Sequence, residues 1–112
     1  MKIFLFSLLI GLTSQTSFVK VLEKDNFQVL MQQESQVIDV RTPEEYALGY
    51  IEGAILIDYK AADFHASISA LNRNVTYLIY CRSGNRSGKA SIIMDSLGFK
   101  KIYDLKGGYM NW

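Results

Sequence analysis

The sequence predicts an α/β fold: a five-stranded, mostly parallel sheet in a three-layer arrangement, with helices on both faces. Short apolar runs rich in β-branched and aromatic residues, which are typical of buried strands, alternate along the chain with segments of helical spacing. This alternation is typical of parallel sheets, because each crossover helix covers one face of the sheet. The chain has 112 residues, of which 49% are hydrophobic, so it can form one small packed domain.

The expected strands and helices alternate from residue 18 onward. The runs that we expect to form strands are residues 18–22, 36–40, 54–57, 76–80 and 101–105. The segments that we expect to form helices are residues 25–32, 43–48, 60–71 and 87–97. No repeat or linker divides this part of the chain, so the sequence predicts a single domain over residues 18–112.

Local signals mark the ends of two of these helices. Pro43 suits the first turn of a helix, with Thr42 as its cap and the acidic Glu45 near the positive end of the helix dipole. We expect Ser87 to cap the last helix and Gly98 to end it.

Residues 1–17 differ from the rest of the chain. Lys2 precedes an apolar run over residues 3–12, and small polar residues follow at 13–17. This pattern predicts a secretory signal peptide or an uncleaved N-terminal anchor. The apolar run is shorter than the roughly 20 residues that span a bilayer. We therefore expect a periplasmic or secreted protein that contacts the inner membrane only if the leader is retained.

Composition argues against two classes of function. The 12 basic and 11 acidic residues nearly cancel and form no basic stripe, which disfavours nucleic-acid binding. With one cysteine and one histidine, His65, the chain offers no Cys/His cluster, and we expect neither a metal nor another cofactor. His65 is expected on the surface. Three methionines are expected to fill the core: Met31, Met94 and Met110.

The only cysteine, Cys81, lies between an expected buried strand and an expected helix. Backbone N–H groups at such a turn can converge on an anion, and the helix dipole favours negative charge there. Arg82 and Arg86 add positive charge. All three effects should lower the pKa of Cys81 and make it a nucleophile near neutral pH. The alternative is a buried structural cysteine.

Other polar residues are expected to support this loop. Asp39 and Arg41 end the second expected strand, so in a parallel sheet they can share a rim with Cys81. We expect the Asp39 carboxylate to brace the loop or pair with an arginine, with a capping or surface role as the alternative. Gly84 should supply a backbone conformation that other residues resist. Ser83 and Ser87 can donate hydrogen bonds to the sulfur or cap the helix.

Five ordered stretches resemble the rhodanese family of sulfurtransferases. They are residues 37–46, 49–55, 80–87, 97–99 and 103–108, followed by Trp112. Together with the leader, they make the chain similar to small single-domain periplasmic rhodaneses of bacteria. The resemblance implies a five-stranded parallel sheet and a persulfide intermediate on Cys81. It also implies that the loop cradles the outer sulfur, with these candidate substrate-binding residues: Arg82, Ser83, Gly84, Asn85, Arg86 and Ser87.

The expected chemistry is sulfur transfer by a monomeric enzyme on small molecules. The Cys81 thiolate would take a sulfane sulfur from a donor such as thiosulfate and pass it to cyanide or a thiol. One rival is a phosphatase or arsenate reductase, but loops of that type place one residue more between cysteine and arginine than the four residues 82–85 found here. The other rival is a sulfur carrier or partner-binding module without turnover.

Overall fold

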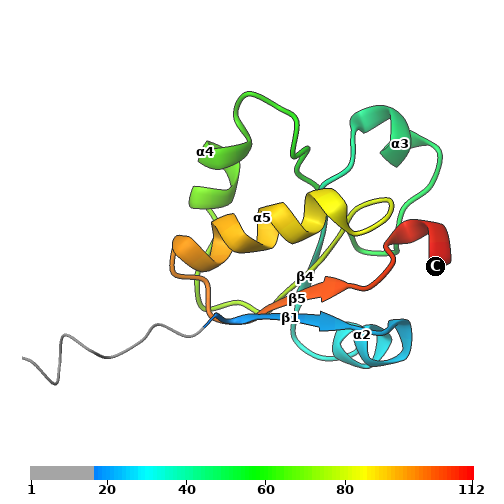
Figure 1. The fold of residues 1–112 in the computed structure, drawn as a ribbon, viewed down its shortest axis with the longest axis horizontal. Coiled ribbons are helices and arrows are strands. Elements are labelled where there is room, and N and C mark those ends of the chain that lie inside the picture. The colour runs from blue at the N-terminus through cyan, green and yellow to red at the C-terminus, as the bar shows by residue number, and fades with distance from the viewer. Residues whose placement is uncertain (1–16) are drawn as a thin grey trace, which may run out of the picture.

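The computed structural model describes residues 17–112 and contains one sheet with helices on both faces (Figure 1). The strands are β1 (Val19–Leu22), β2 (Gln36–Asp39), β3 (Ile55–Leu56), β4 (Tyr77–Tyr80) and β5 (Ile102–Leu105). The helices are α2 (Lys24–Met31), α3 (Pro43–Ala47), α4 (Phe64–Ser69), α5 (Asn85–Ser96) and the 3-10 helix η1 (Tyr109–Asn111). Residues 1–16, which carry nearly all of the expected leader, lie outside the described part of the chain.

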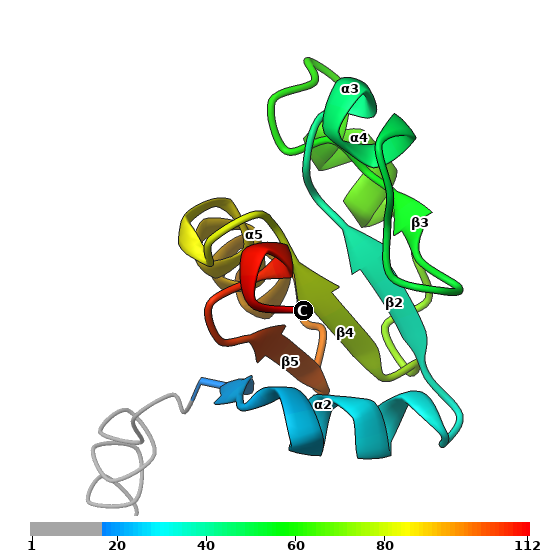
Figure 2. The ribbon, with the colours of Figure 1, turned by 90° about the vertical axis from the view of Figure 1, so that its right-hand side faces the viewer.

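The sheet confirms the predicted fold class. Its strand order is β1-β5-β4-β2-β3, and each neighbouring pair is parallel. In Figure 2, α2 lies along one side of the sheet and α5 along the other, as right-handed crossovers in a parallel sheet require. Because β2 and β4 are neighbours, their carboxyl ends meet at one edge of the sheet.

Strand β4 forms the centre of the core, and all of its residues are buried. Alternate side chains of a strand point to opposite faces. Ile79 and the following Cys81 therefore belong to the apolar cluster beneath α5, which also includes Met94. Leu78 and Tyr80 belong to the cluster beneath α2, together with Phe27 and other side chains. Because Cys81 lies two residues after Ile79, its sulfur is on the same face of the sheet, the one that α5 covers.

The structure confirms the expected ends of two helices and the expected places of two methionines. The cap of α3 is as predicted: the Thr42 hydroxyl accepts a hydrogen bond from Glu45 N, and the Glu45 carboxylate accepts one from Thr42 N. Gly98 follows α5 with a φ of +93°, the left-handed conformation that ends many helices. Met31 packs at the edge of the core and Met94 lies within it, as expected.

The predicted helix over residues 60–71 is wrong in its length, because only Phe64–Ser69 is helical. The preceding residues form turns instead. Lys60 N donates to the Asp58 carboxylate at 2.8 Å, and Ala61 N donates to Asp58 O at 3.1 Å. An aspartate whose side chain bonds the backbone two residues on competes with helix formation, which explains the late start.

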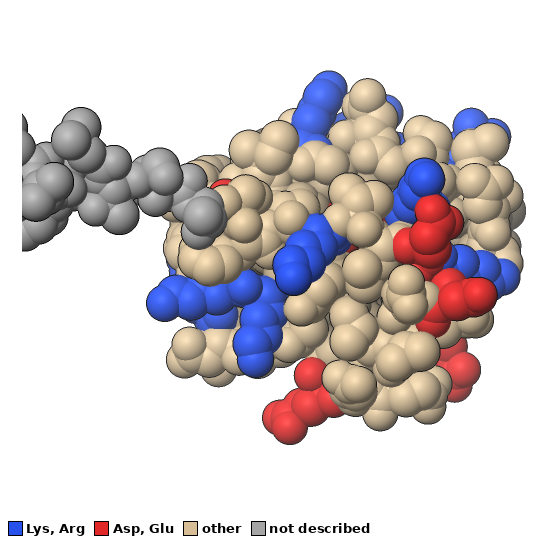
Figure 3. All heavy atoms as spheres, turned by 60° about the horizontal axis from the view of Figure 1, so that its bottom comes forward, with Lys and Arg blue, Asp and Glu red and all other residues tan. Residues whose placement is uncertain are grey.

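The surface carries scattered charge. On the face drawn in Figure 3, Lys and Arg side chains lie singly or in small groups among uncharged side chains. His65 is exposed on α4, as expected. Within residues 17–112, no helix combines the length and apolarity that crossing a membrane would need.

Candidate active site

The loop after β4 turns sharply into α5. Cys81 directly follows the strand, and α5 begins at Asn85. Gly84 is the N-cap, with a φ of +107°, a backbone conformation that L side chains rarely adopt. Gly88 N then donates to Gly84 O at 3.0 Å. The helix therefore starts two residues before Ser87, and the predicted cap at Ser87 is wrong: the left-handed glycine makes the turn without a side-chain cap.

The Cys81 sulfur lies inside this turn. Its Sγ accepts a hydrogen bond from Gly84 N at 3.1 Å, and Cys81 is only 1% exposed. Burial raises the pKa of Cys81, but hydrogen bonds from the Ser87 side chain and from the backbone of Ser87, Gly84 and Ser83 outweigh it, so that the net pKa is lowered. Buried in this way, the sulfur is still surrounded by donors, unlike an inert structural cysteine.

Arg86 was expected to stabilise the Cys81 thiolate, but its side chain binds Glu45. Its guanidinium forms a bidentate ion pair with Glu45, with Nη1–Oε1 at 2.7 Å and Nη2–Oε2 at 3.0 Å. Glu45 is the main cause of the raised pKa of Arg86, and the charge of Cys81 contributes less. Arg82 is exposed and is not among the main groups that lower the pKa of Cys81. Thiolate stabilisation therefore comes chiefly from the loop's hydrogen bonds, which corrects the emphasis on the two arginines.

Asp39 and Arg41 form a buried ion pair at the end of β2. Arg41 Nε lies 3.0 Å from both carboxylate oxygens of Asp39, and Nη2 lies 2.7 Å from Oδ2. The Tyr80 hydroxyl also donates to Asp39 Oδ2, at 2.6 Å. Burial lowers the pKa of Arg41, but the hydrogen bonds and charge of Asp39 outweigh it, and the net shift is upward. Of the two expected roles for Asp39, the structure shows pairing with an arginine.

Tyr80 and Tyr109 hold the Arg41 guanidinium between β4 and η1. The guanidinium carbon lies 5.5 Å from the Tyr80 ring centroid and 4.3 Å from that of Tyr109. Nη2 also donates to Gly49 O at 2.7 Å. With only 4% exposure, the Arg41 side chain is thus held by partners on four segments of the chain: Asp39, Gly49, Tyr80 and Tyr109.

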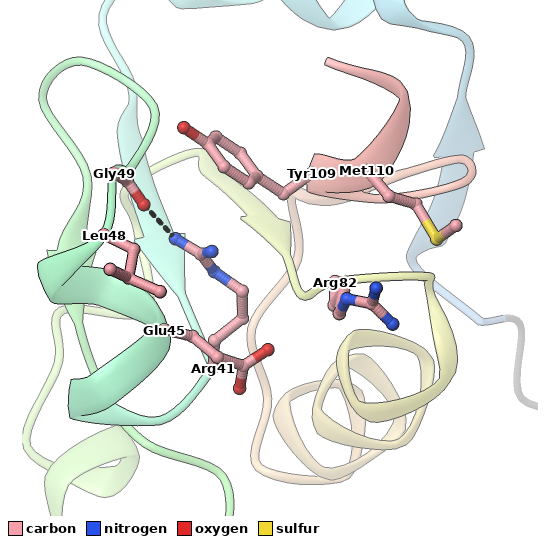
Figure 4. Close-up of a pocket in the computed structure, with 7 residues that line it drawn as sticks. All are labelled: Arg41, Glu45, Leu48, Gly49, Arg82, Tyr109 and Met110. Atoms are coloured by element: carbon pink, nitrogen blue, oxygen red, sulfur yellow. Dashed lines mark hydrogen bonds between the residues drawn. The ribbon is translucent and has the colours of Figure 1, made fainter.

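A cavity of about 370 Å³ opens beside the loop (Figure 4). Its lining residues come from the ends of β2 and β4, from the α3 region and from η1: Arg41, Glu45, Leu48, Gly49, Arg82, Tyr109 and Met110. Figure 4 shows Leu48 and Arg82 on opposite sides of the cavity. Cys81 does not line the cavity, but its immediate neighbour Arg82 does. The cavity is thus lined by two arginines and one carboxylate, and its link to Cys81 in this structure is the neighbouring residue Arg82.

The 3-10 helix η1 supports the loop from the other side. Tyr109 N donates to Cys81 O at 2.8 Å, and Met110 N donates to Arg82 O at 3.0 Å. Sequence reasoning missed these residues, although the Gly107-Gly108 pair before them signals a tight turn. Met110 is exposed at the cavity mouth, so its predicted place in the core is wrong; η1 presents its backbone, not this side chain, to the protein.

Gly108 allows this close approach, which gives a first prediction. Its φ is +65°, and a Cβ there would lie 2.5 Å from Arg82 O and 2.6 Å from Cys81 O. Gly108→Ala should therefore displace η1 and slow alkylation of Cys81 by more than about tenfold, together with a clear loss of stability. Gly98→Ala is the matched control, since Gly98 also has a positive φ but has no atom within 4 Å of its Cβ position. Equal losses of alkylation rate and stability in the two variants would show that backbone strain at a positive φ causes them, and that the close contact with Cys81 O and Arg82 O does not.

The Glu45–Arg86 pair predicts acid sensitivity. Arg86 is the main cause that lowers the pKa of Glu45 to about 2 from 4.5. A carboxylate with a lowered folded-state pKa contributes stability above its unfolded pKa and loses it as the pH falls through the folded value. The free energy of unfolding should thus drop between about pH 4.5 and pH 2, and Glu45→Gln should flatten this part of the profile. Glu44→Gln, in the same helical turn but exposed, should leave the slope unchanged. A wild-type slope retained in Glu45→Gln would contradict the assignment.

The remaining expected site residues lie at the edge of the loop. Ser83 and Asn85 are exposed, and Ser87 is fully buried under the first turn of α5. Residues 17–112 contain no group of three or more His, Cys, Asp or Glu side chains that could hold a metal ion.

Comparison with known proteins shows the family to which this fold belongs. The family model described as rhodanese-like domain matches residues 22–112. The chain belongs to the rhodanese-like family. A thiosulfate sulfurtransferase GlpE from Pseudomonas paraeruginosa is 37% identical over 79 residues, which are 70% of this chain and 69% of that protein. A second protein of that name, from Pseudomonas fluorescens, is 33% identical and covers 83% of this chain and 84% of its own.

A solved structure of a rhodanese-like domain protein from Staphylococcus aureus has the same fold. Its TM-score is 0.74 at 30% identity, over 83% of this chain and 90% of that one. The rhodanese-like domain here thus holds Cys81 at the turn from β4 to α5, at the same edge of the sheet as the buried Asp39–Arg41 pair.

Proposed function

We propose that this rhodanese-like domain is a sulfurtransferase that carries sulfur as a persulfide on Cys81. The observation that carries the proposal is the buried sulfur in the α5 turn, which accepts a hydrogen bond from Gly84 N and has a lowered pKa. A thiolate stabilised in this way is a nucleophile near neutral pH. Relatives named thiosulfate sulfurtransferase support thiosulfate as a donor.

The proposed reaction has two displacement steps. The Cys81 thiolate attacks the outer sulfur of thiosulfate; a new S–S bond forms, the old one breaks, and sulfite leaves with the electron pair. The acceptor, cyanide or a thiolate, then attacks the outer sulfur of the persulfide. Cyanide leaves as thiocyanate, a thiolate leaves as its persulfide, and Cys81 returns as the thiolate. No external oxidant or reductant is needed.

The same donors that lower the pKa of Cys81 would stabilise the persulfide anion. The N–H groups at the start of α5 lie beside the sulfur before any charge forms, so little reorganisation is required during reaction. Arg41 and Arg82 line the cavity through which an anionic donor would approach, and Arg86 neutralises the acidic Glu45 there. The cavity is therefore suited to a small anion.

Loop size favours sulfur over phosphoryl chemistry. Four residues separate Cys81 from Arg86, and the Arg86 guanidinium is already held by Glu45. A cysteine-dependent phosphatase would need that arginine to bind the tetrahedral phosphoryl group. Because Arg86 is bound to Glu45, the arginine that a phosphatase would use to bind the phosphoryl group is already occupied.

The assay that tests the proposal measures thiocyanate and sulfite released from thiosulfate and cyanide. We expect both products in equal amounts over many turnovers, with ping-pong kinetics. An aryl phosphate serves as the control substrate and should show no hydrolysis. Release of a single equivalent per protein would favour the sulfur carrier, and faster phosphate hydrolysis would contradict the sulfurtransferase.

The expected location also stays a proposal. Residues 1–17 should direct the protein across the inner membrane of a bacterium and be removed or kept as an anchor. Cell fractionation with N-terminal sequencing tests this proposal. Full-length protein in the soluble cytoplasmic fraction would contradict it.

A further inference from the structure

The point where residues 1–16 join the domain lies at the opposite edge of the sheet from Cys81. β1 is an edge strand, and it begins at Val19, two residues after the first described residue, Ser17. Because β1, β5 and β4 are parallel, their amino ends share one edge of the sheet. Cys81 directly follows the carboxyl end of β4, so it lies at the other edge. In Figure 1, the arrows of β1 and β5 accordingly point away from this junction, toward the side of the loop that precedes α5.

Exposed apolar side chains lie around this junction. Phe18 is 44% exposed, Val21 of β1 is 61% exposed and Ile92 of α5 is 67% exposed. Phe18 N donates to the Asp95 carboxylate at 3.0 Å, and Asp95 lies three residues after Ile92, on the same side of α5. The start of β1 and this side of α5 are therefore neighbours.

Val21 lies on the same side of the sheet as Ile92. Its register partner is Asp104 of β5, whose Oδ2 lies 3.9 Å from the position of a Cβ on Gly88. Gly88 lies about one helical turn before Ile92, so Val21 and Ile92 are close where α5 covers the edge strand. Single exposed apolar side chains are normal on a protein surface, whereas several that gather at one junction are typical of a contact surface.

Three lysines lie at the same edge of the sheet. Lys20 belongs to β1, and Lys100 and Lys101 directly precede β5, whose first residue Ile102 pairs with Val19. All three lysines are exposed. Figure 3 shows a small group of basic side chains close to the point where the grey trace meets the domain, while most of the acidic surface lies on the opposite side of the view.

The charge at this edge is positive on balance. Arg73 adds a fourth positive charge, since its guanidinium donates to the last carbonyls of α4 and to Leu97 O at the end of α5. Two carboxylates lie nearby: Asp95, which accepts the bond from Phe18 N, and Glu34, which lines a cavity together with Lys101. We call the exposed residues around the junction the leader-side surface: Phe18, Lys20, Val21, Ile92, Lys100 and Lys101.

The sequence before this surface indicates which partner covers it. Residues 3–12 are apolar, but the run is shorter than the roughly 20 residues that span a bilayer. A single short apolar anchor binds a membrane reversibly, and stable attachment needs a second attraction such as a basic patch. Only residues 13–17 separate the apolar run from Phe18, so the leader-side surface lies where that second attraction is needed.

We propose that the leader-side surface lies against an anionic lipid membrane, with residues 1–16 retained as an anchor. The three lysines contact the phosphate groups of the lipids, and the three apolar side chains reach the apolar layer beneath them. Because Cys81 is at the opposite edge of the sheet, the loop after β4 faces away from the membrane in this orientation.

Co-sedimentation of the full chain with lipid vesicles tests this proposal. Lys100→Gln/Lys101→Gln removes two positive charges from the leader-side surface. Lys60→Gln/Lys106→Gln is the matched control, since it removes two exposed charges that follow the carboxyl ends of β3 and β5. On phosphatidylcholine vesicles with about 30% phosphatidylglycerol, the first variant should bind about tenfold more weakly than the wild type, and the control within about twofold of it. On pure phosphatidylcholine all three should bind equally, through the leader.

Three outcomes would overturn the proposal. One is equal binding of the two double variants to the anionic vesicles. Another is wild-type binding that does not depend on phosphatidylglycerol, because the leader alone would then attach the protein. The third is self-association of the full chain without lipid that Ile92→Ser abolishes, which would assign the leader-side surface to a second copy of the chain.

A fluorescent label reports the orientation of the domain on the vesicle. Cys81 is the only cysteine, so Cys81→Ser provides a background in which one introduced cysteine carries the label. An environment-sensitive fluorophore on Ile92→Cys should shift its emission to the blue when anionic vesicles are added, and the same fluorophore on Lys60→Cys should not. A shift at position 60 as large as that at position 92 would contradict the proposed orientation.

Fractionation of cells provides a test that needs no vesicle. We expect the full-length chain in the membrane fraction, and we expect Lys100→Gln/Lys101→Gln to release more of it at high salt than the Lys60→Gln/Lys106→Gln control does. Recovery of the whole population as a shortened chain in the soluble fraction would overturn the proposal. None of these measurements depends on sulfur transfer, so their failure would leave the proposed function of Cys81 unaffected.

Discussion

Cys81→Ser should reduce thiosulfate:cyanide sulfur transfer by more than about 10⁴-fold, because a serine oxygen cannot form the persulfide. The change exchanges one small atom for another at a buried position, so the fold should persist. The midpoint of thermal unfolding should stay within a few degrees of the wild-type value. Initial rates of thiocyanate release, measured with both substrates saturating, give the ratio.

A control variant distinguishes chemistry from damage to α5. Ser96→Ala removes an exposed hydroxyl at the far end of the same helix and should keep activity within about twofold. Cys81→Ser activity within tenfold of the wild type, in protein free of wild-type contamination, would show that another group carries the sulfur.

Asp39→Ala should have the largest effect on stability, about 3–5 kcal/mol of the free energy of unfolding. The change leaves Arg41 buried at 4% exposure without its carboxylate, and it removes the acceptor of the Tyr80 hydroxyl. An uncompensated buried charge costs more than the pair contributes, since the desolvation of the arginine remains. Urea unfolding followed by tyrosine and tryptophan fluorescence measures the difference.

Two matched variants sharpen this result. Glu23→Ala breaks the Lys106–Glu23 pair, whose members are exposed, and should change stability by less than about 1 kcal/mol. Asp39→Asn keeps an acceptor for Tyr80 and removes only the charge, so its effect should be intermediate. If Asp39→Ala lowers the free energy of unfolding by no more than Glu23→Ala does, the buried Asp39–Arg41 pair does not stabilise this edge of the sheet.

The sequence predicted the fold, and it predicted the place of Cys81 between a buried strand and a helix, because both depend on local patterns. Apolar runs alternate with helical segments along the chain, and Cys81 directly follows one of these runs. Thr42 was recognised as the cap of α3 for the same reason, because it directly precedes Pro43 in the first turn of the helix. Such features need only neighbouring residues to be recognised.

The details of the site depend on contacts between distant residues, which local patterns do not reveal. Arg86 looks like a ligand for anions, yet it pairs with Glu45, 41 positions earlier in the chain. We predicted Ser87 as the cap because serine is favoured at that position. In the structure, the left-handed turn at Gly84 starts the helix earlier. Met110 is apolar, but its place was decided by the backbone bonds of η1 to the loop.

The most direct test of the account is the intact mass of the purified domain after incubation with thiosulfate and removal of small molecules. The account predicts that the wild type gains the mass of one sulfur atom, and that cyanide or a thiol removes it again. Cys81→Ser should gain nothing under the same conditions. An unchanged wild-type mass, or the same gain in Cys81→Ser, would contradict a persulfide on Cys81.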